Sequence, residues 1–428
     1  MSIAATKKRK ADSDASPPSI STKAQKIHPF FTKSDASGSK SGASDGSQFQ
    51  WLNPLGPKKT CLYGVNLTPA TYPKIAMFDL DGTIIVSPFG KGQPKKNRHA
   101  SFTWWHKSVV KKLEEVHNSR YSIVVISNQK LSKDLEEWKQ KIHLIAASLP
   151  NVPFRIFAAS ADDEYRKPML GMLHALKDIH ISENVEIDMA ESYLVGDAAG
   201  RPGDHSGTDR KWAINAGLKF YTPEEFFLGQ PASGCQFLGY DTSSVIPDGK
   251  LFTPTLSPKP ELVLLVGYPS MGKSTLCRKH FGPAGYRHIN QDVLGSRPKC
   301  IKATEEALAN GKSCVIDNTN RDGKTRKPYI DIAKRFDVPV RCFKFENSID
   351  LAWHNNMYRT YCLASSTLEN EAKRDKVPNI AYFGFQKNYE EPSLAEGFSE
   401  IVDVRWYFEG SEEERRRWSI LHQSISGK

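Results

Sequence analysis

The sequence predicts an α/β protein of two domains, each built on a mainly parallel β-sheet covered by helices. Three observations support this fold class. The chain has 428 residues, which is long for a single hydrophobic core. Short apolar segments alternate with longer helix-compatible stretches, a pattern typical of parallel sheets. The alternation occurs twice, and residues 230–260, rich in proline and glycine, separate the two series.

The predicted strands are short runs of apolar residues. The first series contains Ile75–Phe78, Ser122–Ile126, Phe154–Ala158 and Ser192–Val195. The second contains Glu261–Val266, Ser313–Ile316 and Val340–Phe345. We therefore expect a tail at 1–48, a first domain at 49–230, a linker at 231–260 with at most a short strand or two, and a second domain at 261–428.

The tail is rich in Ser, Ala, Lys, Asp and Gly. It has too little apolar surface to offset the entropy of ordering, so we expect disorder. Its basic run Lys7–Lys10 is typical of a nuclear import signal, although a solvated charge run has the same composition. Ile27, Phe30 and Phe31 are similar to the apolar part of the motif that docks on the replication sliding clamp, but Ala24 stands where a glutamine is expected.

Composition restricts the partners and the compartment. The formal net charge is +11, which favours a polyanionic partner such as nucleic acid, although many basic proteins bind none. The seven cysteines are scattered, without zinc-finger spacing, as in reduced proteins of the nucleus or cytosol. No apolar run approaches the roughly 20 residues that span a bilayer. The sequence is compatible with a monomer in the nucleus.

The first candidate site follows a predicted strand. Asp79 and Asp81 come directly after Ile75–Phe78, and Gly82 permits a sharp turn. The carboxyl end of a parallel strand is where such folds bind ligands. One carboxylate there can attack phosphorus while its neighbour protonates the leaving oxygen, and Mg²⁺ would screen the negative charges. The alternative of an EF-hand calcium loop fails, because its twelfth position is Gly90 instead of glutamate.

The second candidate site is a phosphate-binding loop. A predicted strand precedes a segment that fits the pattern G-x(4)-G-K-[ST]. In such a loop the backbone N–H groups hold phosphates, Lys273 neutralises the β- and γ-phosphates, and Ser274 binds Mg²⁺. The expected ATP contacts in this loop are Gly267, Tyr268, Pro269, Ser270, Met271, Gly272, Lys273, Ser274 and Thr275.

Residues after the loop indicate a kinase. Asn290-Gln-Asp292 would place the Asp292 carboxylate beside an incoming hydroxyl, whose proton it would accept. A further polar strand end, Asp317–Arg321, follows Ser313–Ile316 and faces the same cleft. Arg359 would lie on a lid helix over the γ-phosphate, or form a surface salt bridge.

The first half resembles the haloacid dehalogenase superfamily. Beyond Asp-x-Asp-Gly-Thr, the resemblance rests on three segments in the right order, Val124–Asn128, Arg166–Pro168 and Leu194–Asp197. The resemblance implies a Rossmann-like phosphatase in which Asp79 is the nucleophile and Asp81 the general acid and base. Ser127 and Lys167 would hold the phosphoryl oxygens. Metal ligands would be Asp79, Asp81 and Asp197, and the choice among Asp197, Asp204 and Asp209 stays open.

Together with the P-loop NTPase-type kinase, the whole chain resembles the eukaryotic polynucleotide kinase/phosphatase family. Segments typical of it include Gly196–Pro202, Thr222–Phe227 and, more loosely, Glu396–Phe398. A phosphopeptide-binding domain found in animal members is replaced here by the short tail, as in fungal-type members. The resemblance implies removal of 3′-phosphates, through an aspartyl-phosphate, and ATP-dependent phosphorylation of 5′-hydroxyls at DNA breaks, which prepares them for ligation.

Basic residues near both sites are candidate nucleic-acid contacts. They are Lys91, Lys95, Lys96 and Arg98, with Trp104 and Trp105 nearby, and Arg321 and Arg326 in the second domain. Each set is equally compatible with a solvated surface. A rival hypothesis keeps the chemistry and changes the substrate, to a metabolite phosphatase fused to a small-molecule kinase. A catalytically inactive scaffold is disfavoured, because both sets of catalytic residue types are intact.

Overall fold

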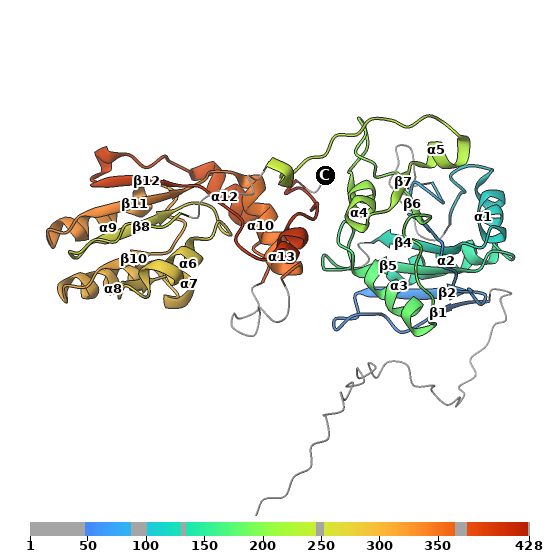
Figure 1. Ribbon diagram of the computed structural model, residues 1–428, viewed down its shortest axis with the longest axis horizontal. Coiled ribbons are helices and arrows are strands. Elements are labelled where there is room, and N and C mark those ends of the chain that lie inside the picture. The colour runs from blue at the N-terminus through green and yellow to red at the C-terminus, as the bar shows by residue number, and fades with distance from the viewer. Residues whose placement is uncertain (1–47, 87–100, 130–133, 245–251, 364–374, 427–428) are drawn as a thin grey trace, which may run out of the picture. The chain divides into compact units, whose positions relative to one another are not determined.

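The computed structural model describes residues 48–86, 101–129, 134–244, 252–363 and 375–426. The tail with its basic run and its apolar motif lies outside these residues. Within them are two β-sheets, each with its own helices and its own hydrophobic core (Figure 1). In this described part, no helix has the length and apolar composition to cross a membrane.

The first sheet has seven strands in the order β1-β2-β5-β4-β3-β6-β7. The neighbours from β5 to β7 pair in parallel, whereas β1 and β2 add an antiparallel edge. The strands are β1 (Phe49–Trp51), β2 (Cys61–Asn66), β3 (Ile75–Phe78), β4 (Ser122–Asn128), β5 (Phe154–Ala159), β6 (Tyr193–Val195) and β7 (Lys219–Tyr221). The helices are α1 (Val109–Asn118), α2 (Leu135–Ala147), α3 (Gly171–Ser182), α4 (Thr208–Ala216) and α5 (Pro223–Leu228).

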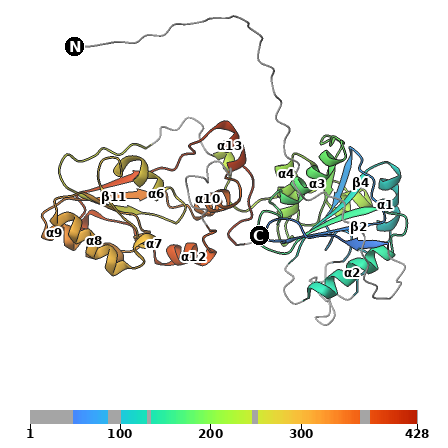
Figure 2. The same ribbon diagram turned by 90° about the horizontal axis from the view of Figure 1, so that it is seen from below.

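Helices cover both faces of this sheet. Successive residues of a strand point to opposite faces, so Ala76 and Phe78 join one core and Ile75 and Met77 another. Helices α1 and α2 pack on the first core, and α3 and α4 on the second. Figure 2 shows α3 and α4 on the other side of the sheet from α2. Because both faces are buried, β3 is wholly apolar and β4 is apolar from Ile123 to Ile126.

The second sheet has five strands, all parallel, in the order β12-β11-β8-β10-β9. They are β8 (Leu262–Val266), β9 (Arg287–Ile289), β10 (Cys314–Ile316), β11 (Val340–Phe345) and β12 (Glu400–Val404). The helices are α6 (Lys273–Leu276), α7 (Gln291–Leu294), α8 (Arg297–Ala309), α9 (Gly323–Arg335), α10 (Ile349–Tyr361), α12 (Asn379–Asn388) and α13 (Glu412–Trp418). Helices α8 and α9 pack on one face, and α6, α10 and α12 on the other.

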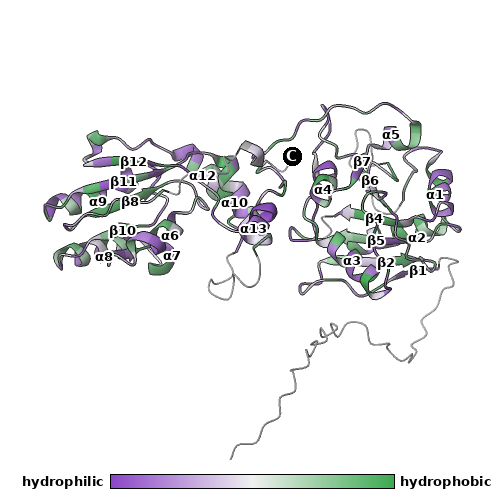
Figure 3. Ribbon diagram, in the orientation of Figure 1, coloured by the Kyte–Doolittle hydropathy of each residue, from purple (hydrophilic) through white to green (hydrophobic). Residues whose placement is uncertain are grey.

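Helix α13 illustrates how a highly charged segment becomes a helix. Ser411 caps its start, three glutamates occupy the first turn and three arginines the last, an order that complements the helix dipole. Figure 3 shows it as a hydrophilic segment. Only Trp418 of this helix is buried, so one aromatic side chain anchors it to the core.

The predicted fold class is confirmed, and every predicted strand is present to within a few residues. The prediction missed β1, β2, β7, β9 and β12, which are short or carry polar residues. Between Leu228 and Leu262, the described residues hold one regular element, the 3-10 helix η2 (Thr242–Ser244). The division into domains at 230 and 261 stays a prediction.

Candidate active sites

The strand order brings the predicted phosphatase residues to one edge of the first sheet. Strands β4, β3 and β6 are adjacent and parallel, so their carboxyl ends meet. Asp79 follows β3, Ser127 lies near the end of β4, and Asp197 follows β6. At Gly82, between these segments, φ is +94°. A β-carbon on this residue would collide with the Asp197 carboxylate, so glycine is required there.

Lys167 is buried among the carboxylates. Its Nζ donates to Asp79 Oδ1 at 2.5 Å and to the Ile126 carbonyl at 3.0 Å, and it lies 2.8 Å from Asp209 Oδ1. Asn128 holds the backbone of Lys167 through two hydrogen bonds, of 2.8 and 3.0 Å. Although burial disfavours its charge, Asp209 and Asp79 raise the pKa of Lys167. The lysine is therefore a fixed cation at the sheet edge.

Three carboxylates form a candidate metal site. One oxygen from each of Asp79, Asp197 and Asp209 lies within 4.8 Å of the others. Burial, with help from neighbouring carboxylates, raises the pKa of Asp79 to about 7, although Lys167 opposes the rise. Burial, followed by Asp79 and Asp209, raises the pKa of Asp197 to about 9. With one lysine among three buried carboxylates, full ionisation of the group is disfavoured. A hard divalent cation such as Mg²⁺ suits three carboxylate oxygens and would favour their ionised forms.

This geometry distinguishes among the three aspartates that the sequence left as alternative metal ligands. Asp197 and Asp209 belong to the carboxylate group. Asp204 instead accepts hydrogen bonds from the backbone of Ala199 and Arg201 and from the Arg201 side chain. Its oxygens are therefore engaged in the local loop. The Asp81 carboxylate, named with the metal ligands from the sequence, is also absent from the carboxylate group found among the described residues.

Gln129 links Asp81 to Ser127. Its Nε2 donates to Asp81 Oδ2 at 2.6 Å and to Ser127 Oγ at 2.8 Å, and its side chain is buried. Sequence reasoning missed this residue, although it directly follows the segment Val124–Asn128. An amide that holds the expected general acid and the expected phosphate-binding hydroxyl fixes their relative orientation.

The phosphate-binding loop connects β8 to α6. Gly272 caps α6 with φ at +87°. Lys273 is buried and its Nζ donates to the carbonyl oxygens of Gly267 and Tyr268. Burial lowers the pKa of Lys273 to about 8, although Asp317 opposes this. The ammonium group is thus enclosed by the loop, and a phosphate group would stabilise its charge.

Asp317, at the end of β10, faces the loop. Burial disfavours its charge, but hydrogen bonds from His288 and Ser274 and the charge of Lys273 keep the pKa of Asp317 below its ordinary value. His288 Nε2 lies 2.9 Å from Asp317 Oδ2. The sequence placed Asp317 in a polar strand end without a role. Its contact with Ser274, the expected Mg²⁺ ligand of the loop, makes it a second candidate ligand.

Asp292 is exposed at the start of α7. A base that accepts a proton from an incoming hydroxyl must be accessible in this way. Asn290 caps this helix, its Oδ1 accepting from the backbone of Asp292 at 2.7 Å. The Asn290 side chain also donates to the Asp317 carbonyl at 2.8 Å. The segment that carries Asp292 is thereby tied to the end of β10, and the Asp292 charge acts on Lys273.

Arg359 lies in the last turn of α10. Its guanidinium donates to Asn356 Oδ1 at 3.2 and 3.3 Å. Its charge contributes to lowering the pKa of Lys273. The arginine therefore lies within electrostatic range of the phosphate-binding loop, as a lid residue would.

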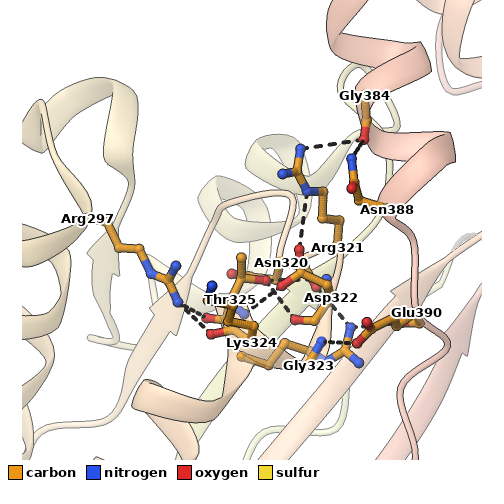
Figure 4. A network of polar contacts seen from close by, with 11 residues as sticks. Arg297, Asn320, Arg321, Asp322, Gly323, Lys324, Thr325, Gly384, Asn388 and Glu390 are labelled. Carbon is orange, nitrogen blue, oxygen red and sulfur yellow. Dashed lines mark hydrogen bonds and ion pairs between the residues drawn. The ribbon is translucent and has the colours of Figure 1, made fainter.

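Arg321 and Arg326 have different environments. Arg321 is partly exposed and contacts Asp322 and the Gly384 carbonyl, in the network of polar contacts around residues 320–325 (Figure 4). Arg326 is 1% exposed, and two of its guanidinium nitrogens each donate to a Glu396 oxygen at 2.8 Å. The expected contact of Arg326 with nucleic acid is inconsistent with this burial, and the residue instead braces α9 against the segment around Glu396.

Of the other expected nucleic-acid contacts, Lys91, Lys95, Lys96 and Arg98 lie outside the described residues. Trp104 and Trp105 are partly buried and pack against the core of the first sheet. Their aromatic rings therefore have a structural role there.

Comparison with known proteins gives two family matches. A family described as polynucleotide kinase 3 phosphatase matches residues 74–227, and one described as an AAA domain matches residues 262–367. The first match begins just before β3 and ends in α5, and the second begins at β8 and ends after α10, so each match covers the central strands of one sheet.

Two relatives align with most of this chain, and a third with a shorter part of it. The chain is 40% identical over 339 residues to a bifunctional polynucleotide phosphatase/kinase from Schizosaccharomyces pombe, covering 77% of this chain and 79% of that protein. It is 33% identical over 392 residues to a putative bifunctional polynucleotide phosphatase/kinase of Acanthamoeba polyphaga mimivirus, covering 82% and 89%. A polynucleotide 3′-phosphatase from Arabidopsis thaliana is 34% identical over 180 residues, covering 37% and 25%.

Proposed function

The chain belongs to the bifunctional polynucleotide phosphatase/kinase family, and on this premise we propose that it removes 3′-phosphates from DNA ends and phosphorylates 5′-hydroxyl ends with ATP. The observation that carries the proposal is that one chain gathers a buried lysine and carboxylates at the carboxyl ends of parallel strands in each of two sheets. Lys167 and three aspartates form the first site. Lys273, Ser274 and Asp317 form the second.

In the phosphatase reaction, an Asp79 oxygen attacks the phosphorus of the 3′-phosphate. The bond between phosphorus and O3′ breaks, and Asp81 gives its proton to O3′. Water then attacks the aspartyl-phosphate and passes a proton to Asp81, and the bond between phosphorus and Asp79 breaks to release phosphate. Lys167 and the Ser127 hydroxyl hold the phosphoryl oxygens in both steps. Mg²⁺ held by Asp79, Asp197 and Asp209 would screen the repulsion between these carboxylates and the phosphate.

In the kinase reaction, Asp292 accepts the proton of the 5′-hydroxyl as its oxygen attacks the γ-phosphorus of ATP. The bond between that phosphorus and the β–γ bridging oxygen breaks, and ADP leaves. Lys273 and Arg359 neutralise the charge that develops on the transferred group. Ser274 and Asp317 would hold the Mg²⁺ that accompanies ATP.

A substrate panel tests the proposal against the metabolite alternative. We expect a 3′-phosphorylated oligonucleotide and a 5′-hydroxyl oligonucleotide to be processed with kcat/KM far above that of nucleoside monophosphates, sugar phosphates and free nucleosides. Parallel RNA ends and nicked, recessed and single-stranded DNA ends define the preferred substrate. Equal or higher kcat/KM on the small molecules would contradict the proposal.

We propose a nuclear location from Lys7–Lys10 and a sliding-clamp contact through Ile27, Phe30 and Phe31, with the enzyme acting as a monomer. The support is the sequence, since these tail residues lie outside the described part. Attaching residues 1–48 to a cytosolic reporter should move it to the nucleus, and replacing the four basic residues should prevent this. Replacing the three apolar residues with alanine should abolish clamp binding and leave import unchanged.

A further inference from the structure

The two carboxylate oxygens of Asp81 have different surroundings. Oδ2 accepts the 2.6 Å hydrogen bond from Gln129. Oδ1 is buried and accepts no hydrogen bond from the described residues. The ammonium of Lys141 lies close to it, with Nζ 3.8 Å from Oδ1. One oxygen is therefore held by an amide, while the other lies close to a positive charge.

Lys141 comes from the buried side of α2. Its side chain is 1% exposed, and its neighbours on the helix, Trp138, Ile142 and Ile145, belong to the hydrophobic core. Burial lowers the pKa of Lys141, and Asp81 opposes this. Placing an ammonium group in a core costs several kcal/mol unless it is paired. The pairing with Asp81 gives a reason for a charged residue at this buried position, where an apolar residue could not interact with the carboxylate.

We propose that Lys141 is a positioning residue for the phosphatase reaction, holding the Asp81 carboxyl group together with Gln129 and stabilising the carboxylate that Asp81 becomes when it protonates the leaving oxygen. The inference rests on the proposed phosphatase function. In the first step the bond between phosphorus and O3′ breaks while the Asp81 proton moves to O3′. A carboxylate is left beside the Lys141 ammonium, and the same ion pair persists until water returns a proton to Asp81.

This role predicts a dependence on the leaving group. A sugar alkoxide is a poor leaving group and needs the Asp81 proton, whereas p-nitrophenolate leaves without one. Lys141→Met keeps the length of the side chain and removes its charge. We expect it to lower kcat for a 3′-phosphorylated oligonucleotide by about 100-fold, the lower range for loss of acid catalysis. We expect the loss on p-nitrophenyl phosphate to be less than about 5-fold, with kcat changed more than KM.

Matched variants complete the experiment. Asp81→Asn should show the same dependence on the leaving group, which proves that the assay detects the acid step. Lys141→Arg keeps the charge and should recover most of the activity. Lys139→Met, on the same helix, removes a partly exposed partner of Glu136 and should leave both rates unchanged. Hydrolysis of p-nitrophenyl phosphate, retained in Lys141→Met, reports that the phosphatase half is folded, and kinase activity, unchanged in every variant, reports the same of the kinase half.

Each outcome decides the inference. A larger loss on the oligonucleotide, with recovery in Lys141→Arg, supports it. Equal losses on both substrates, a change in KM alone, or no loss would overturn it. If the wild-type protein hydrolysed p-nitrophenyl phosphate but no oligonucleotide 3′-phosphate, the proposed function itself would be contradicted, and this inference with it.

Discussion

Lys167 places its Nζ 2.5 Å from Asp79 Oδ1, although the two residues are 88 positions apart in the chain. The lysine follows β5 and the aspartate follows β3, so the contact depends on the parallel arrangement of the sheet. A permanent cation at this point balances one of three clustered carboxylates. The other two carboxylates, when ionised, favour the binding of a metal cation.

Magnesium should stabilise the protein through Asp197 but not through Asp204. Adding Mg²⁺ to metal-free protein should raise the melting temperature by several degrees, since a ligand at 100 times its Kd contributes about 2.7 kcal/mol. Asp197→Asn should remove most of this increase, because it removes one of the grouped carboxylates. Asp204→Asn should retain the increase, even if its melting temperature without metal is lower. Differential scanning calorimetry measures the melting temperatures. If Mg²⁺ raised the melting temperature of Asp197→Asn as much as that of the wild type, the assignment would be contradicted.

The two activities should be separable. Asp79→Asn removes the nucleophile and should abolish 3′-phosphatase activity while leaving kinase activity. Lys273→Ala removes the cation of the phosphate-binding loop and should have the reverse effect, with kinase activity reduced by at least about 100-fold. Both activities are measured on one oligonucleotide that carries a 5′-hydroxyl and a 3′-phosphate. A single substitution that silenced both activities would show that the two-site assignment is wrong.

Arg326 and Arg321 should differ in stability and in DNA binding. Arg326→Met leaves Glu396 without its buried partner and should reduce the free energy of unfolding by about 3 kcal/mol. Arg321→Met affects a partly exposed side chain, so we expect little loss of stability but a higher KM for the 5′-hydroxyl oligonucleotide. Urea denaturation and kinase kinetics measure the two effects. The opposite pattern would restore Arg326 as a nucleic-acid contact.

Gly82 and Gly203 offer a matched test of steric space, because both have φ at +94°. Alanine at either position costs roughly 1 kcal/mol of backbone strain. A β-carbon at Gly203 meets nothing within 4 Å, whereas at Gly82 it meets the Asp197 carboxylate. Gly82→Ala should therefore lose phosphatase activity, and Gly203→Ala should retain it at a similar cost in stability. Equal activities would mean that the Asp197 position is not critical.

The kinase half should lose stability in mild acid. His354 is buried, its Nε2 is hydrogen-bonded to the Trp418 carbonyl oxygen at 2.7 Å, and burial lowers its pKa from 6.5 to about 4. Between these pH values the unfolded state binds the proton more readily than the folded state, so stability falls as pH decreases from about 6.5 to 4. The loss is at most about 3 kcal/mol.

Urea denaturation at several pH values measures this dependence. His354→Gln should reduce the slope of the curve, because the substituted side chain does not titrate. The neighbouring His422, whose pKa is also lowered by burial, retains its own contribution. His117→Gln, in helix α1 of the first sheet, serves as a control and should leave the pH dependence of the kinase half unchanged. A pH dependence identical to wild type in His354→Gln would contradict the assignment.

The sequence alone determined the central parallel strands of both sheets, because strands buried on both faces are apolar and their short runs stand out between helices. It also determined the local motifs, Asp79 with Asp81 and the loop ending at Lys273, because these depend on neighbours in the chain. The match to known relatives agrees with that assignment.

The tertiary structure decided which distant side chains meet. Asp209 and Lys141 join the first site because α4 and α2 pack on the sheet, and Gln129 joins it from the end of β4. Asp204 does not, because its own loop engages its oxygens. Likewise Arg326 and Arg321 have the same charge and similar positions in the chain, yet one is buried and the other partly exposed. Residue type defines the chemistry that is available, and burial and distance, which arise only when the chain folds, define which groups carry it out.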